Sequence, residues 1–131
     1  MRVLGVEPER RPEVREIDGS LESMQHIVGG LIQSIYPFDE PVALVCNDEG
    51  TLMNLPANRG LRDINGQIYD IVFGTFFLCG APVDSDHFVS LTPEQIERYE
   101  KLFHTPEMFW GMDGRIVCIP LAADEASEGK I

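Results

Sequence analysis

Two short segments near the N-terminus have the polar and apolar pattern of β-strands. Residues 2–6 (RVLGV) are mainly apolar, and residues 13–17 (EVREI) alternate polar and apolar side chains. A period of two places alternate side chains on opposite faces of a strand. The pattern therefore predicts a β-hairpin with one face toward solvent and the other toward a core.

The next segment has helical spacing. Its apolar residues follow one another at steps of one, three and four, which places them on one face of a helix: Leu21, Met24, Ile27, Val28, Leu31, Ile32 and Ile35. Residues 18–20 (DGS) supply capping oxygens before this stripe. Pro37 ends it, because the residue before a proline avoids the helical region. We expect one helix as far as Ile35, with Gly29-Gly30 allowing close packing against a sheet; the alternative is that the helix breaks at these two glycines.

Further strands are expected in the middle of the chain. Residues 42–46 (VALVC) are continuously apolar, as in a central strand covered on both faces. After a turn, residues 51–54 are expected to return as a short strand. Residues 65–66 (NG) are a strong hairpin signal. Residues 68–79 are then the longest strand candidate, bent or bulged at Gly74.

A second helix is signalled more specifically. Residues 92–95 (TPEQ) form a capping box with proline at the first helical position. The apolar face of this helix is expected to consist of Ile96, Tyr99, Leu102 and Phe103. The exposed face is expected to have two ion pairs four residues apart, Glu94–Arg98 and Glu97–Lys101. Beyond the helix, a turn at residues 112–114 precedes a strand at residues 115–121.

These elements predict an α+β fold, with a small antiparallel or mixed β-sheet and two principal helices packed on one face. The chain of 131 residues has the length of one domain. We expect a single domain over residues 1–121, and a flexible acidic tail over residues 122–131.

The net charge of the chain limits the kinds of molecule that it can bind. The chain has 22 acidic and 10 basic residues, a net charge of −12, and the acids are spread along it. Such a charge repels phosphate backbones and anionic lipids, so we expect no direct nucleic-acid or membrane partner. Solubility explains the acidity most simply. A surface that imitates nucleic acid, or that binds a basic partner, remains the alternative.

The cysteines and the N-terminus indicate the compartment. Cys46, Cys79 and Cys118 are widely spaced within apolar runs, without the paired spacing of a zinc site. Free buried thiols are expected, and these are typical of a reducing compartment. The N-terminus lacks a signal-peptide apolar region. We therefore expect a cytoplasmic protein that binds no metal or other cofactor.

No motif in the chain specifies a catalytic centre. Phosphate-binding glycine loops, zinc-protease histidine pairs and nucleophile elbows are all missing from the sequence. His26, His87 and His104 fall in three different elements, and each is explained by a structural role. If the protein is an enzyme of an unrecognised kind, Asp70 and His26 are the candidates.

Polar residues gather between the apolar strands of the middle segment. They are Asn47, Asn54, Asn58, Arg59, Tyr69 and Asp70. Arginine and asparagine make planar, paired hydrogen bonds to carboxylates, phosphates and base edges. The functional interpretation is a polar pocket for a small anionic or nucleotide-like ligand. The structural alternative is that the asparagines serve turns and that Arg59 pairs with Asp63 or Asp70.

Two aromatic residues near the C-terminus are candidates for contact with a partner. Phe109 and Trp110 are of the types that dominate interface energies, although such a pair more often packs on its own core. If the strand at residues 115–121 is an exposed edge, it can pair with a second copy of the chain. A homodimer through this region is therefore one possibility.

Several segments resemble the domain of unknown function 3846 family. The resemblance rests on residues 45–50 (VCNDEG), 55–59 (LPANR) and 69–77 (YDIVFGTFF), with weaker support at 14–18 and 90–92. It covers roughly residues 1–104, which leaves residues 105–121 as a C-terminal extension. It implies an association with phages, conjugative elements and gut Firmicute-type genomes, and no established activity or catalytic residues.

Two functional hypotheses follow. The first is a non-enzymatic accessory protein of a phage or mobile element, which acts in counter-defence by binding an unknown protein. The second is a protein that sequesters a small nucleotide-like ligand in the polar pocket.

Overall fold

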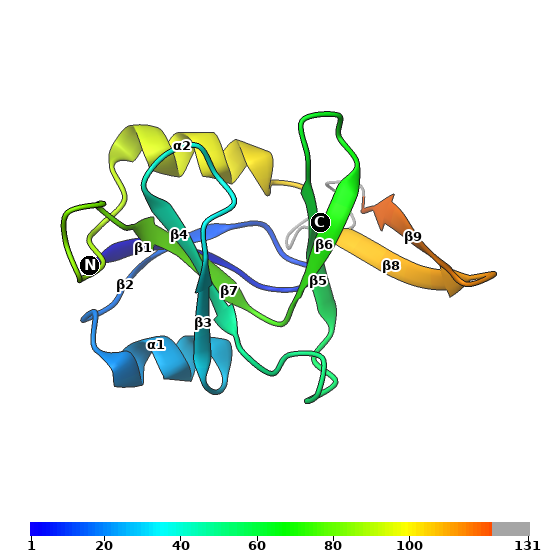
Figure 1. The fold of residues 1–131 in the computed structure, drawn as a ribbon, viewed down its shortest axis with the longest axis horizontal. Helices are drawn as coiled ribbons and strands as arrows, with labels where there is room; N and C mark the ends of the chain where they lie inside the picture. Colours follow the sequence, from blue (N-terminus) through cyan, green and yellow to red (C-terminus); the bar gives the residue numbers. More distant parts are fainter. Residues whose placement is uncertain (122–131) are drawn as a thin grey trace, which may run out of the picture.

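A five-stranded antiparallel sheet forms the centre of the molecule. The computed structural model describes residues 1–121, apart from the side chains of Met112 and Arg115, so the predicted tail at residues 122–131 lies outside the described residues. The sheet order is β2-β1-β7-β4-β3, and two further hairpins are β5–β6 and β8–β9 (Figure 1). The elements are β1 (Arg2–Val6), β2 (Glu13–Glu16), α1 (Leu21–Val28), β3 (Ile32–Ile35), β4 (Val42–Asn47), β5 (Ala57–Arg62), β6 (Ile68–Phe73), β7 (Phe76–Gly80), α2 (Pro93–Leu102), β8 (Glu107–Met112) and β9 (Arg115–Pro120).

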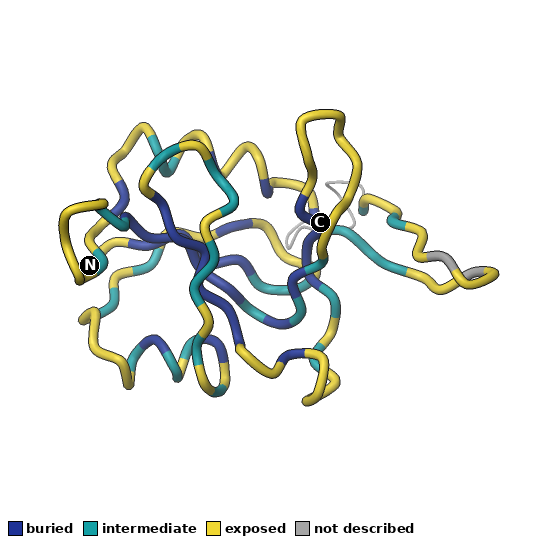
Figure 2. The backbone as a smooth tube through the Cα atoms, in the orientation of Figure 1, coloured by how far each residue is buried: buried dark blue, intermediate teal, exposed yellow. Residues whose placement is uncertain are grey.

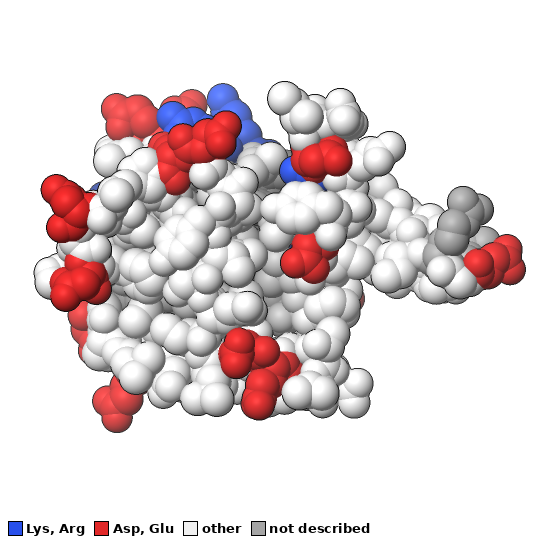
Figure 3. Space-filling view, in the orientation of Figure 1, with Lys and Arg blue, Asp and Glu red and all other residues white. Residues whose placement is uncertain are grey.

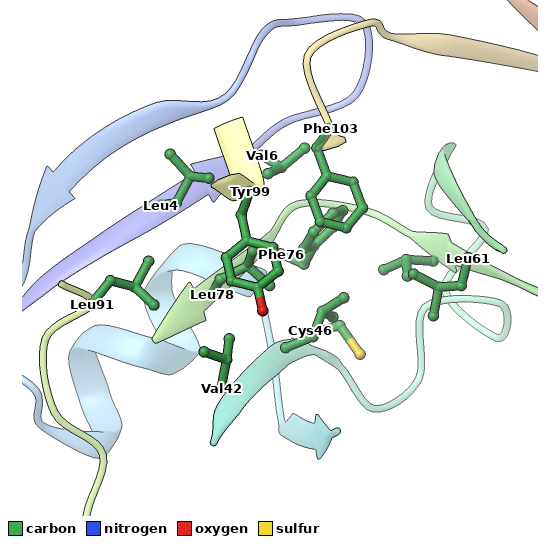
Figure 4. Packing of buried hydrophobic residues seen from close by; sticks show 12 residues of the cluster. Leu4, Val6, Val42, Cys46, Leu61, Phe76, Leu78, Leu91, Tyr99 and Phe103 are labelled. Atoms are coloured by element: carbon green, nitrogen blue, oxygen red, sulfur yellow. The ribbon is translucent and has the colours of Figure 1, made fainter. Parts of the chain in front are cut away.

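The α+β class is confirmed, but the expectation of two helices on one face is wrong. Alternate side chains of β1, β4 and β7 enter two separate clusters. Leu4 and Leu78 pack with Tyr99 of α2 and with Phe103, which caps the end of that helix (Figure 4). Leu44 belongs to the same cluster. Val3, Val45, Phe77 and Cys79 pack with Met24 and Val28 from α1. The helices therefore cover opposite faces, and the three central strands are buried between them (Figure 2).

The first helix is shorter than its apolar pattern suggests. Helix α1 ends at Val28, because Gly29 adopts the left-handed conformation (φ 80°) and its N–H bonds the carbonyl of Gln25 at 2.8 Å. This is a common way to end a helix, and it favours glycine. Residues 32–35 then form the edge strand β3, so the prediction of a helix through Ile35 is wrong. From this strand Ile32 packs against the cluster on the α1 side of the sheet, and Ile35 packs against the cluster on the α2 side.

The middle of the chain also departs from the prediction. Residues 51–54 form a turn, with Asn54 at φ 57°, where a short strand was expected. The predicted strand at residues 68–79 is divided at Gly74 into β6 and β7, which belong to different sheets. Gly74 has φ 85°, and a Cβ there would lie 2.7 Å from Cδ1 of Leu55. The chain changes direction where only glycine fits.

The predicted start of the second helix is confirmed. The Thr92 hydroxyl accepts a hydrogen bond from the Gln95 N–H at 3.1 Å, and the Gln95 side chain accepts one from the Thr92 N–H at 2.9 Å. Pro93 occupies the first turn. Two N–H groups at the start of the helix are thus satisfied within four residues, and these hydrogen bonds fix the residue at which α2 begins.

The hairpin signalled at residues 65–66 and the turn predicted at residues 112–114 are both present, and each joins two antiparallel strands. The first joins β5 to β6, with Gly66 at φ 79°. The second joins β8 to β9, with Asp113 and Gly114 both at positive φ, as a tight hairpin turn requires. The β8–β9 hairpin extends beyond the rest of the molecule (Figure 1). Within residues 1–121, neither helix has the length and apolarity needed to cross a membrane.

A substitution tests the helix end. Gly29→Ala adds a methyl group that meets no atom within 4 Å, so its effect is purely conformational. We expect the free energy of unfolding to fall by about 1 kcal/mol, the cost of the left-handed conformation for a residue with a Cβ. Urea unfolding measures it. Gly111→Ala, also in open space but without positive φ, is the control and is expected to leave stability unchanged; an equal loss in both variants would contradict the assignment.

Candidate functional site

The six polar residues predicted as a ligand site do not gather in one place. Arg59 and Tyr69 line one pocket beside α2, whereas Asn47 and Asp70 line a separate hollow beside β4. Asn54 lies in an exposed turn, and Asn58 is fully buried. The residues therefore have to be considered one group at a time.

Asn58 and Arg59 form a buried polar network. The Asn58 amide donates to the carbonyls of Val6 (2.9 Å) and Gly74 (2.8 Å), and its oxygen accepts a hydrogen bond from Nη1 of Arg59 (2.8 Å). Arg59 further donates from Nε and Nη2 to the carbonyl of Phe103 (3.1 and 3.0 Å) and from Nη2 to that of Arg10 (2.5 Å). Both side chains are at most 1% exposed.

These contacts use the whole donor capacity of Arg59. A guanidinium has five N–H groups, and five hydrogen bonds to the protein are present once the 3.3 Å contact from Nη1 to the Asn58 carbonyl is counted. The contacts close the C-terminal end of α2, whose carbonyls carry partial negative charge. Burial lowers the pKa of Arg59 to about 10, against the opposing charge of Glu107. The geometry favours a structural role.

The other two asparagines serve the backbone. The Asn47 amide donates to the carbonyl of Val28 at the end of α1 (3.1 Å), and its oxygen accepts from the N–H of Glu49 (2.7 Å). Asn54 supplies a left-handed turn residue, a conformation that asparagine tolerates. Both fit the structural alternative considered above.

The catalytic candidates are not assembled. His26 lies exposed on α1, and Asp70 lies exposed on β6, in the hollow beside β4 that His26 does not line. Burial, with the charges of Asp48 and Asp70, raises the pKa of Cys46 to about 11, so the thiol stays protonated. Among residues 1–121, no three His, Cys, Asp or Glu side chains are grouped to hold a metal ion.

A concave surface lies between α2 and the β5–β6 hairpin. Its deep end is a pocket of about 130 Å³, walled by Phe38, Leu61, Arg62, Phe103 and Glu107, among others. It opens onto a wider depression that reaches Ile64 on the hairpin and Leu102 on the helix. We call this surface the groove. Figure 3 shows a notch between the two elements.

The cations around the groove are engaged by carboxylates. Arg62 pairs with Glu107 at 2.7 Å, and the other oxygen of Glu107 accepts the N–H of Gly60 at 2.8 Å. Lys101 pairs with Glu97 at 3.6 Å. Asp39, Asp63 and Glu94 line the same surface and bring further negative charge. The groove therefore combines apolar walls with polar and charged ones, and carboxylates predominate at its rim.

Glu40 connects the β3–β4 loop to α2 at this rim. Its carboxylate accepts hydrogen bonds from Tyr99, Arg98 and, at 3.2 Å, Gln95. Arg98 thus pairs across the groove edge and not with Glu94 as the helical spacing predicted. The bond from the Tyr99 hydroxyl, with those from Gln95 and Arg98, lowers the pKa of Glu40 although partial burial opposes this. Burial raises the pKa of Tyr99.

Sequence reasoning missed most of the groove. Phe38, Leu102 and Glu107 come from three segments that no local pattern connects. Leu102 was assigned to the apolar face of its helix, yet it is 60% exposed. The feature that points to the groove is a leucine that is exposed although its position in the helix predicts burial. Its exposure can be recognised only once the packing of α2 against the rest of the molecule is known.

Comparison with known proteins gives a family and nothing further. A family model described as "Domain of unknown function (DUF3846)" matches residues 1–104. No curated protein and no solved structure matches the chain significantly.

The structural role of Arg59 is testable by substitution. Arg59→Ala removes five hydrogen bonds and leaves buried carbonyl groups without donors. We expect the free energy of unfolding to fall by about 3 kcal/mol or more, since each buried unsatisfied group costs about 1–3 kcal/mol. Arg2→Ala, which removes an exposed ion pair with Glu16, is the control and is expected to cost less than about 1 kcal/mol. An Arg59→Ala protein that melts at the native temperature would contradict this role.

The stability contributed by the hydrogen bonds to the Glu40 carboxylate is expected to depend on pH. In the folded state the pKa of Glu40 lies below its ordinary value of 4.5. The ionised carboxylate therefore adds its full contribution to the free energy of unfolding above pH 4.5, and this contribution is lost as the pH falls through the lower pKa of the folded state. Glu40→Gln is expected to cost about 1 kcal/mol at pH 7, from weaker charged hydrogen bonds. The difference from the native protein should be constant above pH ~5 and shrink below pH ~4.

Urea unfolding at a series of pH values measures this difference. The control is Glu97→Gln, which removes one side of the exposed pair with Lys101 and is expected to cost less than about 0.5 kcal/mol. A Glu40→Gln difference that stays the same at acid pH would show that the carboxylate charge contributes nothing.

Proposed function

The chain belongs to the DUF3846 family, a domain of unknown function, and we propose that it is a binding domain whose groove holds a short basic segment of another protein. The observation that carries this proposal is the shape and lining of the groove. A small, partly open pocket with apolar and polar walls continues into a wider surface that has exposed apolar side chains and an acidic rim. Each of these properties selects for a different part of the partner.

The pocket has the size of one side chain. Its volume is about 130 Å³, close to the ~150 Å³ of an engineered protein cavity that binds benzene. Pockets for drug-sized ligands and cofactors are larger, about 300–1,000 Å³. Phe38, Leu61 and Phe103 supply apolar walls. We infer that a leucine-sized or aromatic side chain of the partner enters here as the anchor.

The wider part of the groove suits a peptide segment. Leu102 on α2 and Tyr69 on β6 are more than half exposed, and Ile64 at the hairpin tip is almost fully exposed. These side chains stand on both sides of the depression. Large apolar side chains grouped around a hollow and rimmed by charged residues are typical of interaction surfaces. A helix or extended segment beyond the anchor would cover them.

The charge selects a basic partner. The rim carboxylates of Asp39, Asp63 and Glu94 add to the ion-paired ones, and the whole chain has a net charge of −12. Opposite charge on the partner speeds association and favours the correct orientation. We therefore expect lysine or arginine residues next to the anchor.

The contacts of Arg59 and Arg62 weigh against the small anionic ligand. Arg59 has no N–H group left to donate, and Arg62 is paired with Glu107. Imitation of nucleic acid gains no support either, because the acidic residues form separated groups on the face drawn in Figure 3. A role in counter-defence, and a cytoplasmic location, stay predictions.

Selection from a displayed library of random dodecapeptides tests the proposal. We expect enriched peptides to share one leucine or aromatic residue flanked by lysine or arginine. A synthetic peptide with the enriched sequence should bind with a dissociation constant in the micromolar range, and Leu102→Glu should weaken binding at least ten-fold, about 1.4 kcal/mol. Isothermal titration calorimetry measures both.

The matched control is Leu21→Glu. Leu21 is 55% exposed on α1, on the opposite face of the sheet, and Leu102 is 60% exposed on α2, so both variants place a carboxylate at an exposed helical leucine. Leu21→Glu is expected to leave the affinity unchanged. Selection without a consensus sequence, or a peptide whose binding is insensitive to Leu102→Glu, would refute the groove as the site.

A further inference from the structure

The β8–β9 hairpin, here called the arm (residues 107–120), is anchored to the body mainly at its base. Glu107 accepts a hydrogen bond from the N–H of Gly60 and pairs with Arg62, and Nη2 of Arg62 also lies 3.5 Å from Sγ of Cys118 on β9. The N–H of Leu121 bonds the carbonyl of Pro106 at 2.8 Å and closes the hairpin at its base. Beyond this base the arm extends away from the central sheet (Figure 1), and most of its outer part is exposed (Figure 2). A two-stranded hairpin alone is at best marginally stable in water.

One face of the arm is entirely apolar over four positions. Met108 is opposite Ile119, and Trp110 is opposite Val117 in the strand register. Directly opposed residues, and residues two apart in one strand, share a face, so these four side chains lie together. Trp110 is 53% exposed, and Ile119 is 45% exposed. A grouped apolar face of this kind is typical of an interaction surface.

The distribution of charge indicates which partner covers this face. The body is strongly acidic, whereas the arm between Met108 and Pro120 contains one acid, Asp113, and one base, Arg115. A contact confined to the neutral arm keeps two acidic bodies apart, which limits their repulsion within the screening length of about 10 Å. The four-residue face contains no group that would select a charged partner, and it is complementary to itself.

The edge of the arm points to the same partner. Among the described residues, β9 pairs only with β8. Arg115 and Pro120 stand at the two ends of β9, whereas its middle residues 116–119 (IVCI) carry no charge, proline or bulge. Natural proteins usually protect an exposed edge strand with such features. The middle of this edge lacks them, which fits an edge and a face that another copy of the same chain approaches.

We propose that two copies of this chain associate through their arms, with the apolar faces formed by Met108, Trp110, Val117 and Ile119 packed against each other about a two-fold axis. Such isologous contacts are the commonest form of homodimer. The face is small, and interfaces below about 1,200 Å² in total area are typical of weak complexes. We expect a dissociation constant on the order of tens of micromolar.

Trp110 is the only tryptophan of the chain, so intrinsic fluorescence reports directly on the arm. The experiment dilutes the native 131-residue chain from millimolar to submicromolar concentration. Sedimentation equilibrium gives the fraction of dimer, and the emission maximum of Trp110 is recorded on the same samples. The expected result is a blue shift that rises in parallel with the dimer fraction, because the indole loses water contact.

Salt separates this interface from one held by ion pairs. Raising the ionic strength from about 0.05 M to about 0.5 M screens the repulsion between the bodies, so the proposed dimer should tighten. An interface based on opposite charges would weaken under the same change.

Two variants localise the contact. Ile119→Lys places a charge in the face and keeps Trp110 as the reporter, and it is expected to abolish dimerisation and the blue shift at millimolar concentration. The control is Tyr36→Lys, at an aromatic side chain that is 61% exposed at the end of β3, with expected native dimerisation. Unchanged far-ultraviolet circular dichroism and melting temperature show that the body of each variant is folded.

Three results would overturn the proposal. They are a monomer throughout the concentration range, a dimer that forms without a change in Trp110 emission, and an Ile119→Lys protein that dimerises like the native one. In the second and third cases the association lies elsewhere on the molecule. None of these outcomes bears on the groove, whose test uses peptide binding.

Discussion

The packing of this domain depends on the buried guanidinium of Arg59 and its neighbour Asn58. Burial of a charge costs several kcal/mol unless hydrogen bonds compensate it. Here carbonyl groups from the β1–β2 loop and the end of α2 supply the compensation, together with the Asn58 side chain. Asn58 in turn donates hydrogen bonds to the carbonyl of Val6 at the end of β1 and to that of Gly74 between β6 and β7, and so fixes both segments. The pair therefore sets the position of α2 against the β5–β6 hairpin, and with it the walls of the groove.

Local chemistry predicted those parts of the fold that local contacts decide. The capping box at Thr92 and the hairpin dipeptide at residues 65–66 satisfy their backbone groups within a few residues, so a short sequence window contains the whole cause. The extent of α1 was not decided locally. Ile32 and Ile35 could pack against the core either as part of a helix or as part of a strand. Gly29 ends the helix, and the residues after it form a strand.

The placement of the helices and of the candidate site could not be predicted from the sequence for a related reason. The continuous apolar run of β4 shows that both faces are covered, but it does not show which helix covers which face. The polar residues of the middle segment were recognised as unusual, and their chemistry was assigned to a ligand. For Asn58 and Arg59, the main-chain partners that explain their burial are carbonyls 16 to 52 residues away along the chain, and no spacing rule reveals them.

The position of Glu107 has a consequence for the boundary of the domain. The family model ends at residue 104, yet Glu107 satisfies the main chain of Gly60, neutralises Arg62 and forms one wall of the pocket. A polypeptide cut at residue 104 would keep every segment that identifies the family. It would nevertheless leave a β5 N–H group and an arginine without their partners. The recognisable unit and the physically complete unit are therefore different lengths of the same chain.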